Sequence, residues 1–259
     1  MKPVQQLSIF ASVSVLIVCL TFSAGFASAG SIGIPSGGVI SYPGIVYFKA
    51  GENLGDWYPY GNVEPGISMV TSPVYKGAYA YKMFRAGLDT QPHTMINWGQ
   101  SVHQKEAYTG FALYIPSDFS SPEWCVIYEF CQENPFRKNL VLYYNYDASF
   151  GTEALQLVTW SPDNAFHLLY RQTLPRDQWI KIILFGRMDD VDGRVVLWID
   201  GQQVYESGNI NLMFEREEFC SYMLGIYCDV SNPYDMTLYF DQAVVASTLE
   251  KTMQELSPT

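Results

Sequence analysis

The chain is poor in charge, and above all in basic charge. Only 16% of its 259 residues are charged, and 15 Lys and Arg stand against 26 Asp and Glu, which gives a net charge of −11 at pH 7. No cluster of basic residues offsets the resulting field, which repels polyanions such as DNA and RNA. The composition therefore argues against nucleic acid as a partner and fits a neutral sugar polymer or a ligand bridged by a cation.

Several catalytic and metal-binding motifs are also missing. There is no CxxC pair, which with only three histidines argues against a zinc site. The G-x-S-x-G elbow of serine hydrolases and the glycine-rich phosphate loop are absent as well. His93, His103 and His167 are isolated in the sequence, and we interpret them as surface or hydrogen-bonded structural residues.

The first 29 residues have the pattern of a signal peptide. Lys2 provides the positive start, the stretch from Leu7 to Phe22 carries no charge, and Ala27-Ser28-Ala29 is a small-residue cleavage site. A permanent membrane anchor is the alternative, but the apolar stretch is short for a spanning helix and no stop-transfer charges follow it. We expect a secreted, extracellular or cell-surface protein without a stable membrane span, in which residues 30–44 form a flexible lead-in.

The pattern from Ile45 onward is typical of an all-β protein. Short apolar runs, rich in aromatic residues, alternate with turn residues, as in an antiparallel sandwich or barrel. Asp192-Gly193 and Asp200-Gly201 are hairpin signals, because Gly accepts a positive φ, and they predict a three-stranded meander over residues 179–206. We expect one domain over residues 45–248 and a mobile polar tail over residues 249–259. Two short segments, Leu212 to Phe219 and Ser247 to Leu256, look helical.

The spacing of the cysteines predicts which strands are neighbours. After signal cleavage the chain keeps Cys125, Cys131, Cys220 and Cys228. Neither close pair can bond along one straight strand, because the two residues would lie too far apart. The sequence numbers of Cys125 and Cys228 add to nearly the same total as those of Cys131 and Cys220, as expected for antiparallel neighbours. Two disulfides across the pair of strands, or four separate buried thiols, both fit this pattern.

Several segments resemble the concanavalin-A-like (laminin-G-like) jelly rolls of exported carbohydrate-active proteins. They are residues 72–80, SPVYKGAYA; residues 108–116, YTGFALYIP; Trp179-Ile180-Lys181 followed by residues 195–201, VVLWIDG; and residues 238–241, LYFD. The resemblance covers roughly residues 40–248 and implies a two-sheet antiparallel jelly-roll sandwich. This fold hosts lectins, lyases, hydrolases and adhesion modules, so the resemblance alone does not name a function.

The resemblance also bears on cofactors. No organic cofactor is implied, but in some related domains a residue that matches Asp241 holds a structural calcium ion. The alternative interpretation of Asp241 is that its carboxylate caps the end of a strand.

The alginate-lyase-like members of this fold indicate what catalysis requires. They carry an Arg-x-Glu strand, a Gln-x-His strand and a K-A-G-x-Y-x-Q strand, in which Arg neutralises the uronate carboxylate and Tyr or His removes the C5 proton. Residues 224–229, LGIYCD, resemble the last of these, so Tyr227 matches the catalytic tyrosine, and Gln132 matches the Gln. No His follows Gln132 two residues later, and no Arg-x-Glu occurs near Thr94 to Asn97. Charge neutralisation is therefore expected to be missing.

A sugar-binding surface needs less than a catalytic site. Trp124, Tyr128 and Gln132 alternate along one strand and are predicted to share a face. If Cys228 pairs with Cys125, Tyr227 and Asp229 lie on that face as well. The rings would stack on sugar C–H groups, and the polar side chains would hold hydroxyl groups.

Two further candidates remain open at this point. The arrangement above places Glu129, a further ligand-binding candidate, on the buried face, whereas the opposite orientation makes Tyr128 a core residue; the sequence does not decide which face is concave. Trp57, in the aromatic segment 57–60, is a second binding candidate in a predicted exposed loop, or in a loop packed over the sandwich edge.

These observations favour a secreted, lectin-like carbohydrate-binding jelly roll that is not catalytic and whose partner is a polysaccharide or other glycan. Two alternatives stay open. One is a polysaccharide lyase that acts by β-elimination on a uronate-containing polymer, with a divergent site around Tyr227. The other is a cell-surface structural or adhesion module with no glycan ligand.

Overall fold

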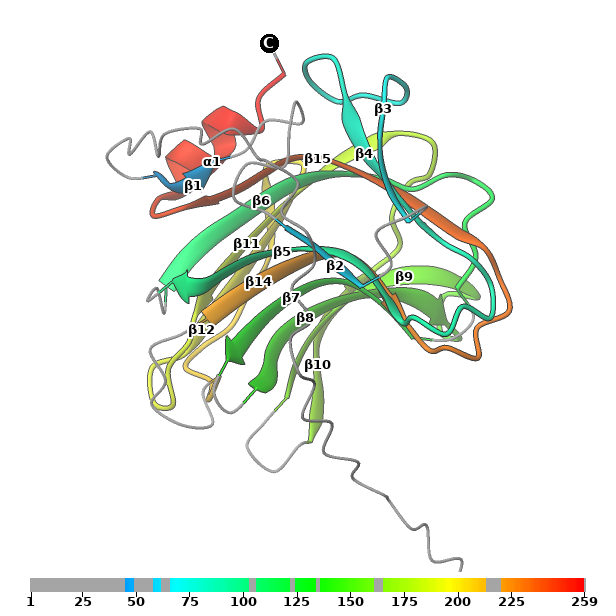
Figure 1. Ribbon diagram of the computed structural model, residues 1–259. Coiled ribbons are helices and arrows are strands. Elements are labelled where there is room, and N and C mark those ends of the chain that lie inside the picture. The colour runs from blue at the N-terminus through cyan, green and yellow to red at the C-terminus, as the bar shows by residue number, and fades with distance from the viewer. Residues whose placement is uncertain are drawn as a thin grey trace, which may run out of the picture. The chain divides into compact units, whose positions relative to one another are not determined.

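The computed structural model describes residues 45–48, 58–61, 66–102, 106–121, 124–133, 136–160, 165–212 and 220–258. Within these residues, fifteen strands form two antiparallel sheets, and one short helix follows the last strand (Figure 1). The elements are β1 (Ile45–Phe48), β2 (Tyr58–Gly61), β3 (Ile67–Val70), β4 (Ala80–Arg85), β5 (His93–Val102), β6 (Glu106–Tyr114), β7 (Cys125–Glu133), β8 (Phe136–Asp147), β9 (Thr152–Trp160), β10 (Phe166–Gln172), β11 (Trp179–Arg187), β12 (Arg194–Ile199), β13 (Gln202–Glu206), β14 (Cys220–Cys228), β15 (Met236–Ala246) and α1 (Leu249–Glu255).

The two sheets make a sandwich, which confirms the predicted all-β jelly-roll class. The eight-stranded sheet has the order β13-β12-β11-β6-β15-β4-β3, with β1 also paired to β15, and the seven-stranded sheet has the order β10-β9-β8-β7-β14-β5-β2. The predicted meander over residues 179–206 is present as β11, β12 and β13. Its second turn contains Gly201 at φ 82°, the positive value for which the Asp-Gly signal selects glycine.

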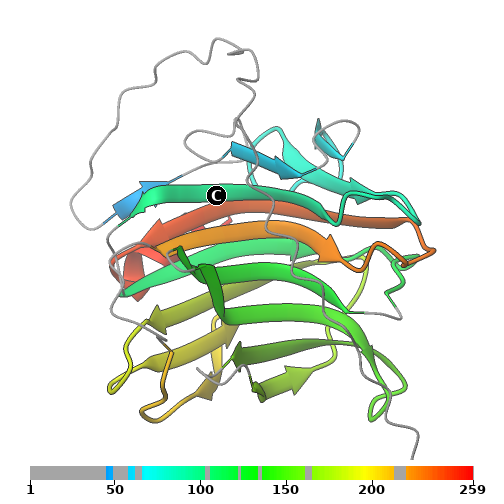
Figure 2. The same ribbon diagram turned by 60° about the horizontal axis from the view of Figure 1, so that its bottom comes forward.

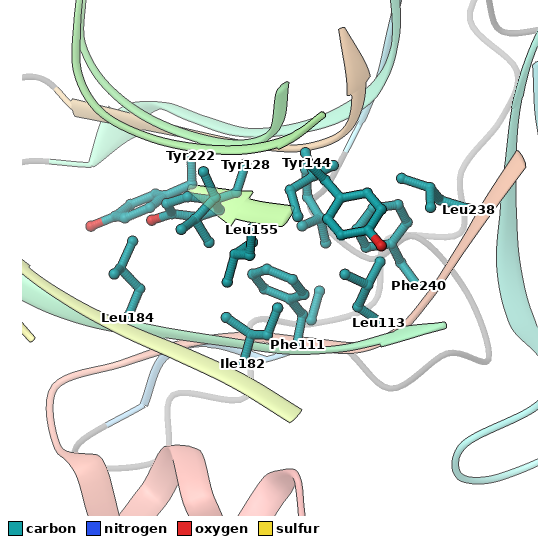
Figure 3. Packing of buried hydrophobic residues seen from close by; sticks show 14 of the residues in the cluster. Phe111, Leu113, Tyr128, Tyr144, Leu155, Ile182, Leu184, Tyr222, Leu238 and Phe240 are labelled. Carbon is teal, nitrogen blue, oxygen red and sulfur yellow. The ribbon is translucent and has the colours of Figure 1, made fainter. Parts of the chain in front are cut away.

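The core lies between the two sheets (Figure 3). The seven-stranded sheet contributes Tyr128, Tyr144, Leu155 and Tyr222, and the eight-stranded sheet contributes Phe111, Leu113, Ile182, Leu184, Leu238 and Phe240. Burying each side chain of this size stabilises the fold by about 1.5–3 kcal/mol. The outer face of the eight-stranded sheet also carries buried apolar side chains, among them Ile183, Phe185 and Val244. Helix α1 covers part of that face and keeps these side chains from water.

Helix α1 corrects the prediction of a mobile tail after residue 248. Thr248 caps the helix by accepting a hydrogen bond from the backbone N–H of Lys251. Leu249, Met253 and Leu256 fall on one face of the helix and pack on the outer side of the eight-stranded sheet. The helix itself agrees with the sequence, in which Ser247 to Leu256 looks helical. Only the expectation of mobility, which depended on the polar composition, is at variance with this packing.

The predicted pairing of the two cysteine-bearing strands is confirmed, because β14 lies beside β7. Cys228 is directly opposite Cys125, where the Cα separation of antiparallel partners suits a disulfide. The second predicted pair is wrong by one position: past the register shift between Leu224 and Tyr227, Cys220 is opposite Gln132 and Cys131 is opposite Ser221.

The structure does not contain the predicted Cys125–Cys228 disulfide, since both side chains are reduced thiols. Burial raises the pKa of the Cys125 thiol, and burial raises that of Cys228 to about 11. Thiols of this kind react slowly while the protein stays folded, because the thiolate is the reactive form. Oxidation of this pair to a disulfide stays a prediction.

The N-terminal predictions fall on the part of the chain that the structure leaves undescribed. The signal peptide over residues 1–29 and the lead-in over residues 30–44 both lie outside the described residues. Across the described residues, no helix has the length and apolar character needed to span a bilayer.

Candidate functional site

A second group of buried side chains lies on the outer face of the seven-stranded sheet, opposite the core. Its apolar members are Met95, Val126, Cys131, Val141, Tyr143, Val158 and Met223, with Trp124, Trp160 and Tyr227 packed against them. The strands of this sheet bow toward the core in Figure 3, so the outer face is concave. This answers the question of orientation that the sequence left open.

Tyr227 lies on this concave face near the end of β14, which runs between β7 and β5. The His93 ring stacks on the Tyr227 ring with centroids 4.1 Å apart and an interplanar angle of 17°. The Nζ atom of Lys138 lies 3.7 Å from the centroid of the same ring. Because β5 lies on one side of β14 and β7 and β8 lie on the other (Figure 2), His93 and Lys138 cover opposite faces of the Tyr227 ring.

Trp124 completes the aromatic surroundings of Tyr227. Its ring meets Tyr227 edge to face, with centroids 4.8 Å apart and an interplanar angle of 77°. Such a contact stabilises a ring pair by about 0.5–1.5 kcal/mol beyond area burial. The Tyr227 ring is therefore fixed on three sides.

A glycine two residues before Tyr227 allows β5 to come close to β14. Gly225 has φ 149°, and a Cβ atom at this position would lie 2.4 Å from the carbonyl oxygen of Thr94. A side chain here would push the two strands apart, whereas the observed register places His93 directly opposite Tyr227. The Gly-x-Tyr motif therefore positions His93 through close strand packing.

Lys138 is held by a buried carboxylate on the neighbouring strand. Its Nζ atom lies 2.6 Å from Oε1 of Glu129, whose side chain is only 1% exposed. The Cys131 thiol donates a weak hydrogen bond to the other carboxylate oxygen, at 3.7 Å. Burial lowers the pKa of Lys138, but attraction to Glu129 outweighs it, so the net pKa is raised and the ammonium stays charged near neutral pH.

His93 has the opposite electrostatic character. Burial, reinforced by the positive charge of Lys138, lowers its pKa to about 4. The imidazole is therefore neutral near neutral pH, and one of its two ring nitrogens carries no proton. A charged ammonium and a neutral imidazole thus flank one tyrosine ring, an arrangement that suits proton transfer beside a bound anion.

The sequence predicted Trp124, Tyr227 and Glu129 as site residues, and the structure brings them together on this face. Tyr128 does not belong with them: it is a core residue, and its hydroxyl donates to Oγ1 of Thr109 at 3.1 Å. The reason is a register shift between Val126 and Tyr128, which breaks the strict alternation along β7. The same shift places Glu129 on the concave face, contrary to the orientation expected with Trp124 and Tyr128 together.

Other predicted ligand residues lie at the edges of the site. The Asp229 carboxylate accepts the backbone N–H of Ser231 at 2.8 Å, and this backbone hydrogen bond is the main cause that lowers its pKa, with Trp124 a lesser one. Gln132 lies on β7, but its side chain is outside the described part of the structure. Trp57 is also outside it, and Tyr58–Gly61 forms the edge strand β2 in place of the predicted loop.

Asp241 does not fit the expected calcium ion. Its carboxylate accepts the backbone N–H groups of Tyr75, Lys76 and Gln242 at 3.0, 3.1 and 2.7 Å, so its oxygens hold the chain in place. No group of three or more His, Cys, Asp or Glu side chains arranged for a metal occurs among the described residues. Asp241 lies inside β15, beside the irregularity between Asp241 and Val244, so it does not cap a strand end either. Its carboxylate ties the segment at Tyr75 and Lys76 to β15.

Sequence reasoning missed the two partners of Tyr227. His93 was interpreted as an isolated structural residue, and Lys138 was not considered. Lys138 supplies the positive charge that was expected to be missing, but it does so from β8, across β7, and not from the strand at residues 94–97. No local motif marks such a contact, because it depends on the order of the strands in the sheet.

Comparison with known proteins adds a family and a set of similar folds. A family model described as polysaccharide lyase matches residues 52–244. The chain is similar to an endo-beta-1,4-glucuronan lyase from the fungus Trichoderma reesei, at 17% identity and a TM-score of 0.65, over 79% of this chain and 96% of that one. It is also similar to the cellulose induced protein Cip1, at 14% identity and a TM-score of 0.55, over 76% and 93% of the two chains.

A third similar structure is described as a binding domain. It is the binding domain of botulinum neurotoxin DC in complex with rat synaptotagmin II, at 8% identity and a TM-score of 0.56, over 83% of this chain and 50% of that chain. At these identities the likenesses concern the fold alone. No curated protein sequence matches the chain significantly.

Proposed function

The chain belongs to the polysaccharide lyase family, and from this premise we propose that it cleaves a uronate-containing polysaccharide by β-elimination at Tyr227. The observation that carries the proposal is the position of the Tyr227 ring between the neutral imidazole of His93 and the ammonium group of Lys138. This proposal departs from the non-catalytic module that the sequence favoured, because that expectation depended on a missing positive charge.

Each of the three residues has one role in the proposed reaction. The Lys138 ammonium pairs with the uronate carboxylate, which stabilises the negative charge that develops when the C5–H bond breaks. The neutral His93 imidazole accepts the C5 proton, the C5–H electron pair forms the C4=C5 double bond, and the C4–O bond breaks. The Tyr227 hydroxyl donates its proton to the leaving oxygen, and exchange with solvent then restores both groups.

One observation favours a second candidate, a module that binds the polymer without cleaving it. Glu129 lies 2.6 Å from Lys138, so the charge that would attract a uronate carboxylate is already partly balanced. A site of this kind would hold a sugar beside Trp124 without stabilising an enolate-like transition state. The two candidates differ in whether the polymer is shortened.

The deciding experiment mixes the protein with glucuronan, the polymer named for the similar lyase, and with a neutral polymer such as cellulose oligomers. We expect glucuronan to be shortened, as seen by size-exclusion chromatography with light scattering. Ultraviolet absorbance of the conjugated C4=C5 double bond should rise with each cut, and the neutral polymer should stay intact. Co-elution with glucuronan of unchanged length would support the binding module instead.

Removal of the site charge should lower the rate. Because an unpaired Glu129 would destabilise the fold, the test is the double variant Lys138→Met with Glu129→Gln. We expect kcat/KM on glucuronan to fall by about 100-fold, measured by the absorbance assay. Lys251→Met, on α1 at the other sheet, is the matched control and should keep the parent rate. An unchanged rate in the double variant would remove Lys138 from the mechanism.

The lowered pKa of His93 predicts a pH dependence of stability. The pKa of the imidazole is about 4 in the folded protein, against 6.5 for an unperturbed histidine, so the unfolded chain binds the proton more tightly. Its contribution to stability is therefore fully present above pH 6.5 and is lost as the pH falls toward 4. When the melting temperature is measured over this pH range, it should fall more steeply with decreasing pH for the parent than for His93→Asn.

The control for this prediction is the exposed His167, because His167→Asn should leave the pH profile of the denaturation midpoint unchanged. Equal slopes for the parent and His93→Asn would contradict burial of a neutral imidazole at this position.

A further inference from the structure

A second cluster of aromatic rings lies on the concave face, toward the edge of the seven-stranded sheet. Phe166 on β10 is directly opposite Trp160 on β9, so both point to the same side of the sheet. Their rings meet edge to face with centroids 5.7 Å apart, and Phe166 also lies 6.2 Å from the ring of Tyr143. We call Tyr143, Trp160 and Phe166 the edge aromatic cluster.

The edge aromatic cluster presents apolar surface to solvent. Phe166 is 49% exposed, and Leu168, two residues further along β10, is 42% exposed. Leu168 is opposite Val158, which belongs to the concave face, so Phe166 and Leu168 extend the same surface. Exposed apolar side chains that gather on one face of a sheet commonly mark a binding surface.

The cluster is continuous with the proposed catalytic centre. Tyr143 on β8 packs with Val126 and Val141 in the apolar group of the concave face, against which Tyr227 also packs. The sheet order places β7, β8 and β9 between β14 and β10, so Phe166 lies four strand spacings from Tyr227. At roughly 4.8 Å for each spacing, the distance across the sheet is about 19 Å. This span corresponds to several sugar units of an extended chain that crosses the strands.

We propose that the edge aromatic cluster is a distal subsite, which binds a sugar of the same polysaccharide chain several units away from the bond that is cleaved. The Phe166 ring and the Trp160 edge offer the apolar surface on which the C–H face of a pyranose ring stacks. The proposal rests on the proposed function for the identity of the polymer. The subsite contributes affinity that only a long chain can use, because a short oligosaccharide cannot reach both places.

The test measures binding without cleavage. All variants carry Tyr227→Phe to prevent turnover, and the dissociation constant for glucuronan is measured by affinity electrophoresis. Competition by a glucuronan trisaccharide gives the affinity for a short ligand at the same time. We expect Phe166→Ala to weaken polymer binding by about fivefold to tenfold, with an unchanged inhibition constant for the trisaccharide.

Phe150→Ala provides a matched control. Phe150 is also an exposed phenylalanine, at 45%, but it lies in the turn before β9, at the opposite end of that strand from Trp160. We expect its replacement to leave both affinities unchanged. Polymer affinity in Phe166→Ala equal to that of the parent, an equal loss for the trisaccharide, or no binding of glucuronan by the parent would each overturn the subsite.

The outcomes for the subsite and for the lyase can be told apart. A length-dependent loss of binding in Phe166→Ala together with no cleavage by the unmodified protein would uphold the subsite and refute the proposed function. Cleavage of glucuronan by the unmodified protein and by Phe166→Ala with the same KM would uphold the proposed function and refute the subsite.

Discussion

Replacement of Tyr227 with Phe is expected to lower kcat/KM on glucuronan by about 10²–10⁴-fold, the range for loss of a general acid. The change removes only the hydroxyl group that is proposed to protonate the leaving oxygen. The ring itself remains, so the stack with His93, the contact with Lys138 and the edge contact with Trp124 are all retained. The dissociation constant for the polymer and the melting temperature should therefore stay close to the parent values.

The measurement combines the absorbance assay for the unsaturated product with affinity electrophoresis. Tyr146→Phe is the matched control, because Tyr146 also loses one hydroxyl but is an exposed residue at the end of β8. It should keep the parent rate. Full activity in Tyr227→Phe would exclude this hydroxyl from the reaction, and loss of polymer binding in step with the rate would make Tyr227 a binding residue only.

Replacement of Arg85 with Met is expected to destabilise the protein by about 3–5 kcal/mol. Arg85 is fully buried at the end of β4, and its guanidinium group donates to backbone carbonyl oxygens on two segments. Nη2 lies 3.0 Å from the oxygen of Asp89 and 3.0 Å from that of Asp229, while Nε and Nη1 reach Gln91 and Ala86 at 3.4 Å. Methionine fills a similar volume but leaves these carbonyl groups without a donor.

Thermal denaturation tests this prediction. A loss of this size corresponds to a fall of roughly 10 °C in melting temperature for a domain of this length. The control is Arg194→Met, which removes an arginine at the surface whose partner is Glu206 and should change stability by less than about 1 kcal/mol. Equal melting temperatures for the two variants would show that the buried guanidinium does not hold these segments together.

Replacement of Arg85 should also lower the activity of the candidate site. The arginine links the connection between β4 and β5 to Asp229, directly after β14. His93 and Tyr227 lie at the ends of β5 and β14 that this link joins. Arg85→Met that remains folded at low temperature should therefore cleave glucuronan more slowly than the parent.

The sequence was a good guide wherever the relevant signal was local or followed from strand register. The alternation of apolar runs with turn residues predicted an antiparallel sandwich or barrel, and the family resemblance predicted the two-sheet jelly roll. The two Asp-Gly turns predicted the meander. The positions of Cys125 and Cys228 predicted that β7 and β14 are neighbours, because antiparallel partners keep a nearly constant sum of sequence numbers.

The failures have equally specific causes. The register shift between Val126 and Tyr128 in β7 directs Tyr128 into the core and Glu129 to the concave face. A prediction that assumes strict alternation of side chains along the strand cannot include such a shift. Lys138 was missed because its contact with Tyr227 spans two strand spacings and joins positions far apart in the chain. The helix after residue 248 was predicted, but its packing on the sheet was not, because the apolar stripe of α1 comprises only a few residues in a polar segment.

The order of the strands in the two sheets means that neither sheet can be completed until the last strands of the chain are available. β14 lies between β5 and β7, and β15 lies between β4 and β6, so each sheet receives a central strand from the late part of the chain. Until those strands have emerged from the ribosome, the earlier strands on either side of each gap have no partner along one edge. Such edges invite pairing with other chains, and folding that depends on contacts of long sequence separation is slow. A chain of this topology gains from staying unfolded until β15 has been synthesised, since both sheets can close only then.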